Sequence, residues 1–118
     1  MRAYELMIIF DGDLEEEAVS ASLGKVTASI ESEGGRVASV LDSEPWGRRR
    51  FAYQINHKRE GVYVVLDVVT GAGNLDSTDR ILRLADRNEV VRHKIIRLPD
   101  TEAARRGLTD ESVPAEAS

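Results

Sequence analysis

The chain contains no cysteine among its 118 residues. A disulfide scaffold, a zinc–thiolate site and a thiol nucleophile are therefore excluded, and this composition suits a reducing compartment. Aromatic residues make up only 5% of the sequence, so each one is individually informative. No apolar run approaches the ~18 residues of a membrane span, and the N-terminal residues lack the apolar stretch of a secretory signal. We therefore expect a cytoplasmic protein without membrane contact.

Charge is distributed unevenly along the chain. The formal net charge is −5, which argues against a generic nucleic-acid binder. The charged side chains of residues 11–33, however, are seven acids and Lys25, whereas those of residues 45–60 and 80–98 are predominantly basic. A protein with one acidic side and one basic side can dock on a polyanion in a fixed orientation.

Hydrophobic periodicity predicts six elements in the order βαββαβ. The elements are a strand at 3–10, a helix at 13–33, an interrupted and bulged strand at 36–55, a strand at 62–69, a helix that starts at Asn74 or Asp76 and runs to about Asn88, and a strand at 90–98. This order predicts an α+β protein, a ferredoxin-like sandwich with a four-stranded antiparallel sheet and two helices on one face. We expect residues 1–98 to form one domain. Residues 99–118 are acidic and poor in apolar side chains, which predicts a disordered C-terminal tail.

The predicted topology leaves one face of the sheet without helices. The first and third strands should be central, and their outer face would then display Met7, Ile9, Tyr63 and Val65. An uncovered apolar patch of this kind usually marks a partner surface.

A basic stretch leads directly into the aromatic part of the interrupted strand. Three consecutive arginines, Arg48, Arg49 and Arg50, stand between Trp46 and a segment in which Phe51, Tyr53 and Ile55 alternate with other residues. Such a segment suits contact with a phosphate backbone, although a solvated charge run beside a core strand is an equally reasonable interpretation.

Catalysis finds little support in the sequence. His57 and His93 have no serine or carboxylate at a motif spacing, and neither has a second metal ligand nearby. The Gly71–Gly73 loop lacks the further residues of a phosphate-binding loop. An acylphosphatase needs an arginine in its first loop, where this chain has Asp11 and Asp13. Tyr63 alone would make a weak base-stacking platform. We expect no enzymatic activity, metal, cofactor or small-molecule substrate.

Several short motifs resemble one known family. These are Met1–Glu5, Gly47–Ile55 with its Arg-Arg-x-Ala-Tyr core, Gly61–Tyr63 and Val91–Lys94, in the right order over residues 1 to about 98. They are similar to the sixth protein of the bacterial small ribosomal subunit. The resemblance implies a ribosome-bound, non-enzymatic protein that binds the central domain of the small-subunit ribosomal RNA together with the eighteenth small-subunit protein.

The resemblance also suggests roles for individual residues. Arg48, Arg49 and Arg50 would hold RNA phosphates, with Arg2, Arg92 and Lys94 as further candidates. The residues expected to brace the hairpin or contact the partner are Trp46, Phe51, Tyr53, Met7, Ile9, Tyr63 and Val65. The alternative is a ferredoxin-like regulatory or ligand-binding module that dimerises through its open sheet face.

Overall fold

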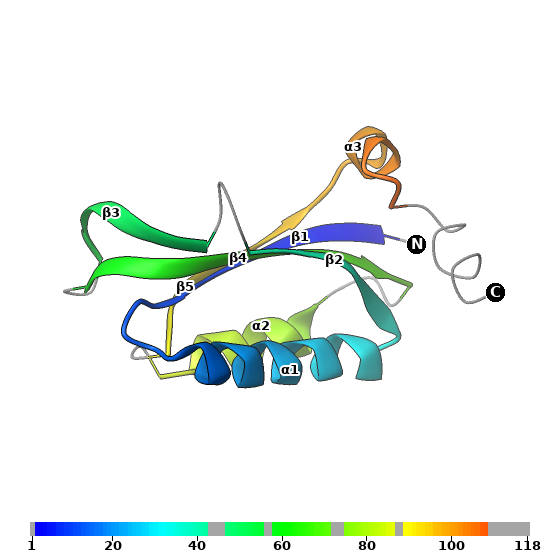
Figure 1. Ribbon diagram of the computed structural model, residues 1–118. Helices are drawn as coiled ribbons and strands as arrows, with labels where there is room; N and C mark the ends of the chain where they lie inside the picture. Colours follow the sequence, from blue (N-terminus) through cyan, green and yellow to red (C-terminus); the bar gives the residue numbers. More distant parts are fainter. Residues whose placement is uncertain (1, 43–46, 56–57, 72–74, 87–88, 109–118) are drawn as a thin grey trace.

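The computed structural model describes residues 2–42, 47–55, 58–71, 75–86 and 89–108. The chain forms β1 (Arg2–Asp11), α1 (Glu16–Ser32), β2 (Gly35–Leu41), β3 (Gly47–Ile55), β4 (Lys58–Thr70), α2 (Asp76–Leu84), β5 (Val90–Arg97) and α3 (Asp100–Arg105). The strands make one antiparallel sheet in the order β2-β4-β1-β5, and β3 also pairs with β4. Helices α1 and α2 cover one face of this sheet (Figure 1). The predicted α+β, ferredoxin-like fold is confirmed.

The sheet has five strands instead of the predicted four, because the interrupted strand is divided into β2 and β3. Leu41 of β2 pairs with Val65, and Gly47 of β3 pairs with Tyr63, so both strands lie along the same edge of β4. Because β2 and β3 follow one another along this edge, the sheet is still four strands wide, as predicted. The predicted bulge is present in β2, where the register shifts between Val37 and Ser39.

The main core lies between the sheet and the two long helices. Alternate residues of β1 point into it, and Leu6, Ile8 and Phe10 are completely buried. Helix α1 contributes Val26 and Ile30 from its buried stripe. Burial of each such side chain contributes ~1.5–3 kcal/mol. The alternation that predicted the inner face of β1 is therefore realised in the packing.

Helix α3 lies in the segment that was predicted to be disordered. It packs on the face of the sheet opposite α1 and α2 (Figure 1). Ala103 and Leu108 are buried against Ala3 and Val69, in a second apolar cluster that also contains Leu98. The expectation of disorder therefore does not hold for residues 99–108, because a few small apolar side chains find a preformed sheet surface to pack on. Residues 109–118 lie outside the described part of the chain.

Candidate nucleic-acid interface

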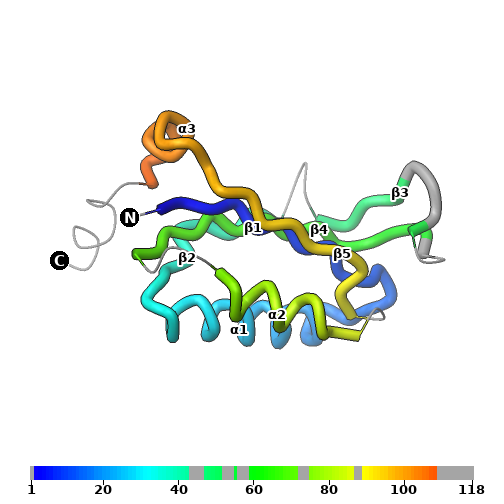
Figure 2. Tube along the Cα trace, turned by 180° about the vertical axis from the view of Figure 1, so that it is seen from behind, coloured from blue at the N-terminus to red at the C-terminus, as the bar shows by residue number. Residues whose placement is uncertain are grey.

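The β3–β4 hairpin extends past the end of the central strand β1. The last residue of β1 to pair with β4 is Asp11, opposite Gly61, whereas β4 continues to pair with β3 as far as Lys58. Figure 2 shows the hairpin projecting at this end of the molecule, opposite the end that carries α3. All three consecutive arginines lie on β3 in this hairpin and are exposed.

The three arginines have different surroundings. Arg48 donates hydrogen bonds from Nη1 to the Gly12 carbonyl oxygen and, at 2.9 Å, to Glu60 Oε1. Arg49 lies over the ring of Tyr63, with 5.7 Å between Cζ and the ring centroid, a cation–π distance. Arg50 is exposed and stands opposite Glu60 in the strand register. Arg48 thus ties the hairpin to the turn after β1, whereas Arg49 and Arg50 form no ion pair with an acidic side chain in the described ranges.

The side chain of Phe51 packs against other residues of this chain. Its side chain is only 8% exposed and packs with Ile9 and Val91 on the outer face of the sheet. Its ring meets Tyr63 edge to face, with centroids 6.2 Å apart. A Cβ atom on Gly61 would lie 2.8 Å from Phe51 Cζ, so glycine provides the room for this ring. Of the two roles considered for Phe51, the geometry supports bracing the hairpin and not contacting a partner.

Two further predicted cationic residues share this outer face. Arg92 and Lys94 are exposed on the edge strand β5 and pair with Ile9 and Met7 of β1. Ile9 also pairs with Tyr63, and the Arg49 guanidinium lies over the ring of Tyr63. Arg92 and Arg49 therefore lie on the same face of the sheet, on the strands that flank this central pair.

Arg2 lies elsewhere. It pairs with Thr70 at the start of β1, whereas Arg49 pairs with Gly61, at the level of Asp11. Nine residues of extended strand separate these levels by about 30 Å. The structure therefore brings Arg49, Arg92 and Lys94 to one face and leaves Arg2 at the other end of the molecule.

The predicted partner surface is more covered than expected. Met7 and Tyr63 are half-buried, but Ile9 is 5% exposed and Val65 only 1% exposed. Phe51 and Val91 cover Ile9. Ile9 and Val65 are therefore core residues of the outer face and offer little surface to a partner. Trp46 and the side chain of Tyr53 lie outside the described part of the structure.

Two exposed apolar residues on this face were missed by the sequence analysis. Leu41 pairs with Val65, and Ile96 pairs with Glu5, so both lie on the outer face at opposite edges of the sheet. They are 42% and 40% exposed, respectively. The mixed pattern of β5 did not reveal which of its residues face outward, and only the pairing with β1 resolves this.

An ionic cluster that was also missed joins α3 to the outer face. Arg106 Nη1 lies 3.1 Å from Glu5 Oε1 and 3.0 Å from Asp67 Oδ1, and its Nε lies 2.8 Å from Glu102 Oε2. Ser39 donates a further hydrogen bond to Asp67. The hydrogen bond from Arg106 lowers the pKa of Glu102, and the same bond, together with Glu5 and Asp67, raises the pKa of Arg106. This arrangement stabilises α3 on the sheet.

The described residues offer little for metal or membrane chemistry. They contain no cluster of three or more His, Asp or Glu side chains that could hold a metal ion. His93 faces the helices and lies 2.8 Å from Asp79 Oδ1, and His57 falls outside the described ranges. None of the described helices is long and apolar enough to cross a membrane.

The fold and this surface define a class: an α+β protein of ferredoxin-like type, with exposed arginines on a projecting hairpin. Comparison with known proteins identifies the family. The model of the family described as "Ribosomal protein S6" matches residues 3–97, so the chain belongs to the ribosomal protein S6 family. This family is structural and non-enzymatic, and the resemblance inferred from the motifs is thereby confirmed.

Individual relatives span nearly the same length. Small ribosomal subunit protein bS6 of Acidothermus cellulolyticus is 40% identical over 100 residues, covering 85% of this chain and 98% of that protein. The bS6 protein of Salinispora tropica is 43% identical over 97 residues, with 82% and 96% coverage. The crystal structure of 30S ribosomal protein S6 from Thermotoga maritima superposes with a TM-score of 0.74 at 30% identity, covering 90% of this chain and 95% of that one.

Proposed function

We propose that this chain is a structural component of the small ribosomal subunit. It binds the central domain of the small-subunit ribosomal RNA together with the eighteenth small-subunit protein, and is ribosome-bound in the cytoplasm. Membership of the ribosomal protein S6 family supports the ribosomal role, as do relatives named as small ribosomal subunit proteins. The choice of RNA domain and protein partner rests on the motif resemblance.

The observation that carries the RNA-binding proposal is a set of exposed cations on the hairpin and on the edge strand β5, in an otherwise acidic chain. Arg50, Arg92 and Lys94 are exposed, and no acidic side chain within the described ranges forms an ion pair with them. Their charges are therefore available to phosphates. Neutralisation of phosphates with release of counterions supplies much of the affinity of such interfaces.

The surroundings of the arginines suggest a division of roles. Arg48 positions the hairpin, since its guanidinium already donates hydrogen bonds to the Gly12 carbonyl oxygen and to Glu60. Arg49 keeps its N–H donors available at the edges of the guanidinium while its face rests on Tyr63. We assign phosphate contacts first to Arg49 and Arg50, then to Arg92 and Lys94. Arg2 would need a separate contact.

The protein partner would meet the apolar side chains that remain accessible on the outer face. We assign this contact to Met7 and Tyr63, with Leu41 and Ile96 extending it toward the two edges of the sheet. The alternative, a module that dimerises through an open sheet face, is less well supported. Phe51 and α3 already cover two parts of that face.

A single charge reversal on the hairpin tests the RNA contact. Arg50→Glu should weaken binding to an RNA fragment of the central domain, measured with the eighteenth protein present at a series of salt concentrations. Loss of one phosphate contact should reduce the slope of log affinity against log salt by roughly 0.7–0.9. Lys25→Glu on the exposed face of α1 is the matched control, because it makes the same change of charge away from the hairpin.

The outcomes separate the site from the function. Equal affinity and slope for Arg50→Glu and the wild-type protein would remove the hairpin from the RNA interface. If the wild-type protein failed to join the RNA even beside the partner, the proposed function itself would be wrong. Comparable losses in both variants would indicate only a general effect of net charge and would also count against the hairpin.

A further inference from the structure

Helix α3 covers a part of the outer face that has both an apolar and a charged component. The apolar component consists of Ala3, Val69 and Leu98, against which Ala103 and Leu108 are buried. None of these residues belongs to the main core between the sheet and the two long helices. The contact of α3 with the sheet is therefore separate from the packing that holds the domain together.

The charged component consists of two carboxylates that stand directly opposite each other. Glu5 of β1 and Asp67 of β4 are register partners, and like charges in such positions destabilise a sheet. Arg106 places Nη1 3.1 Å from Glu5 Oε1 and 3.0 Å from Asp67 Oδ1. A guanidinium from α3 thus offsets a repulsion that the sheet itself contains. Together with the three apolar side chains of the sheet side, these two carboxylates form what we call the α3 surface.

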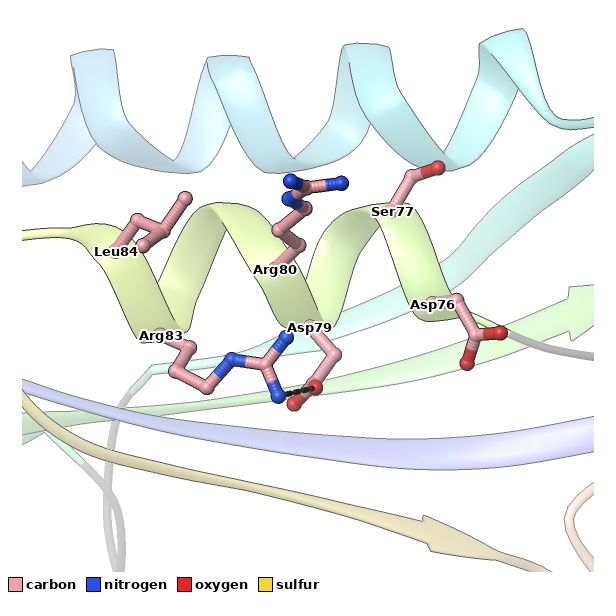
Figure 3. Close-up of a pocket in the computed structure, with 6 residues that line it drawn as sticks. All are labelled: Asp76, Ser77, Asp79, Arg80, Arg83 and Leu84. Carbon is pink, nitrogen blue, oxygen red and sulfur yellow. Dashed lines mark ion pairs between the residues drawn. The ribbon is translucent and has the colours of Figure 1, made fainter.

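An arginine on α2 shows the opposite arrangement. Figure 3 shows Arg83 paired with Asp79, one turn earlier on the same helix, beside a pocket whose six lining residues all belong to α2. This exposed contact of 3.5 Å is local and contributes little. The two acceptors of Arg106 on the sheet, in contrast, lie 101 and 39 residues away in the sequence. The sheet therefore supplies a preformed acceptor for a guanidinium, and α3 is the segment that fills it.

Helix α3 is held in place by few contacts. It is six residues long, its N-cap makes no side-chain hydrogen bond, and of its helical residues only Ala103 is buried. The side chain of Arg106 remains 29% exposed. Elements with few buried apolar contacts open at low free energy. Helix α3 can therefore leave the sheet while the rest of the domain stays folded.

The α3 surface belongs to the part of the chain that relatives share, whereas most of α3 does not. The family model matches residues 3–97, which include β4 and nearly all of β1. In two of the bS6 relatives, matched stretches of 100 and 97 residues account for 98% and 96% of the protein. These relatives leave no room for a full counterpart of α3 with its Arg106 and Leu108. The same region of their sheet is therefore free of such a helix.

We propose that α3 is a displaceable occupant of a partner-binding surface, which the protein partner fills with a basic segment of its own. An arginine or lysine of this segment lies between Glu5 and Asp67, and its apolar side chains replace those of α3. Ile96 is the register partner of Glu5 and is 40% exposed, so the α3 surface is continuous with the apolar residues already assigned to the partner. The inference rests on the proposed function, which identifies this partner as the eighteenth small-subunit protein.

Two substitutions on opposite sides of one ion pair test the proposal. Arg106→Gln weakens the docking of α3 and leaves the sheet unchanged. The eighteenth protein should then bind about three- to tenfold tighter in the presence of the RNA fragment, because apparent affinity rises with the fraction of open molecules. Adding Glu5→Gln to Arg106→Gln removes the acceptor that the partner needs, and should weaken binding about tenfold relative to the single variant.

Arg105→Gln is the matched control. It makes the same change of charge on the same helix, but the Arg105 side chain is 76% exposed and its ion pair is with Glu102 of α3 itself. We expect the affinity of this variant to equal that of the wild-type protein. A urea unfolding curve for each variant checks that the domain is folded.

Hydrogen exchange of the Leu108 amide, which bonds to the Ala103 carbonyl, gives a second measurement. Its protection in the wild-type protein should fall when the eighteenth protein binds. A rise in protection, or weaker binding by Arg106→Gln than by Arg105→Gln, would make α3 a part of the interface and overturn the inference. Equal affinities of all the variants would place the α3 surface outside the interface. In these cases the proposed function would stand, whereas a wild-type protein that gave no complex would contradict the proposed function itself.

Discussion

At the scale of single residues, glycine at position 61 determines how the basic hairpin is attached to the sheet. A Cβ atom there would lie 2.8 Å from Ile9 Cγ2, Phe10 O and Phe51 Cζ. The backbone oxygen of Phe10 cannot move without disturbing the β1–β4 pairing. Phe51 can therefore seal the outer face only because residue 61 has no side chain.

Gly61→Ala should destabilise the protein by about 1–3 kcal/mol, the range for overpacking a core. The measurement is the free energy of unfolding in urea. Gly24→Ala is the matched control, since no atom lies within 4 Å of its added Cβ. Gly24 lies inside α1, so the control should stabilise by roughly 0.5–1 kcal/mol. A Gly61→Ala variant as stable as the wild-type protein would contradict this account of Phe51.

The basic residues show why position in the sequence does not determine role. Arg48, Arg49 and Arg50 are neighbours, and all three were predicted to hold phosphates. In the structure Arg48 is bound to the Gly12 carbonyl and Glu60, while Arg49 rests on Tyr63. The residue type could be read from the sequence, but its contacts come from residues far along the chain.

At the scale of elements, α3 is the largest difference from the sequence-based expectation. It is six residues long and lies beyond the residues 3–97 that match the family model. Its composition predicts no stable helix alone, since short isolated helices are marginal in water. Docking through Ala103, Leu108 and Arg106 supplies the stabilisation that local propensity lacks.

The docking of α3 should depend on pH on the acid side. Glu102 has a lowered pKa, so it contributes stability that is fully present above its ordinary value of 4.5 and is lost as the pH falls through the lowered value. Arg106, with its raised pKa, stays charged throughout this range. The protection factor of the Leu108 amide, which bonds to the Ala103 carbonyl at 2.8 Å, reports this docking.

We expect this protection factor to be constant near neutral pH and to fall once the pH drops below 4.5. Arg106→Gln should lower the protection at neutral pH and reduce its dependence on acid, because the carboxylates lose their shared partner. If the two proteins lost protection at the same pH and to the same extent, the ionic cluster would not be what stabilises α3.

At the scale of the whole molecule, the separation of charge gives the protein an orientation. The C-terminal end of α1 carries the exposed Glu31 and Glu33, whereas the projecting hairpin carries exposed arginines on β3 and Arg59 on β4. The acidic end of α1 should be repelled from a phosphate backbone while the hairpin is attracted. An acidic net charge is therefore compatible with binding a polyanion on one side.

Directed hydroxyl-radical probing tests this orientation. The chain has no native cysteine, so Arg59→Cys and Glu31→Cys each provide a unique attachment point for an iron chelate on an exposed position. In the complex with RNA and the eighteenth protein, the chelate at position 59 should cleave the central domain strongly, and that at position 31 should give only weak cleavage. Stronger cleavage from position 31 would reverse the proposed orientation.

The sequence by itself determined the βαββαβ order up to residue 98, the inward face of β1 and β4, the bulge in β2 and the family. These features are local, because a period of two or 3.6 residues assigns a side chain to a face without reference to distant residues. Only the tertiary structure decided that Phe51 closes over Gly61, that β5 turns Arg92 and Lys94 outward and that α3 docks on the sheet. Each of these depends on contacts between residues far apart in the chain, whose energies no local pattern contains.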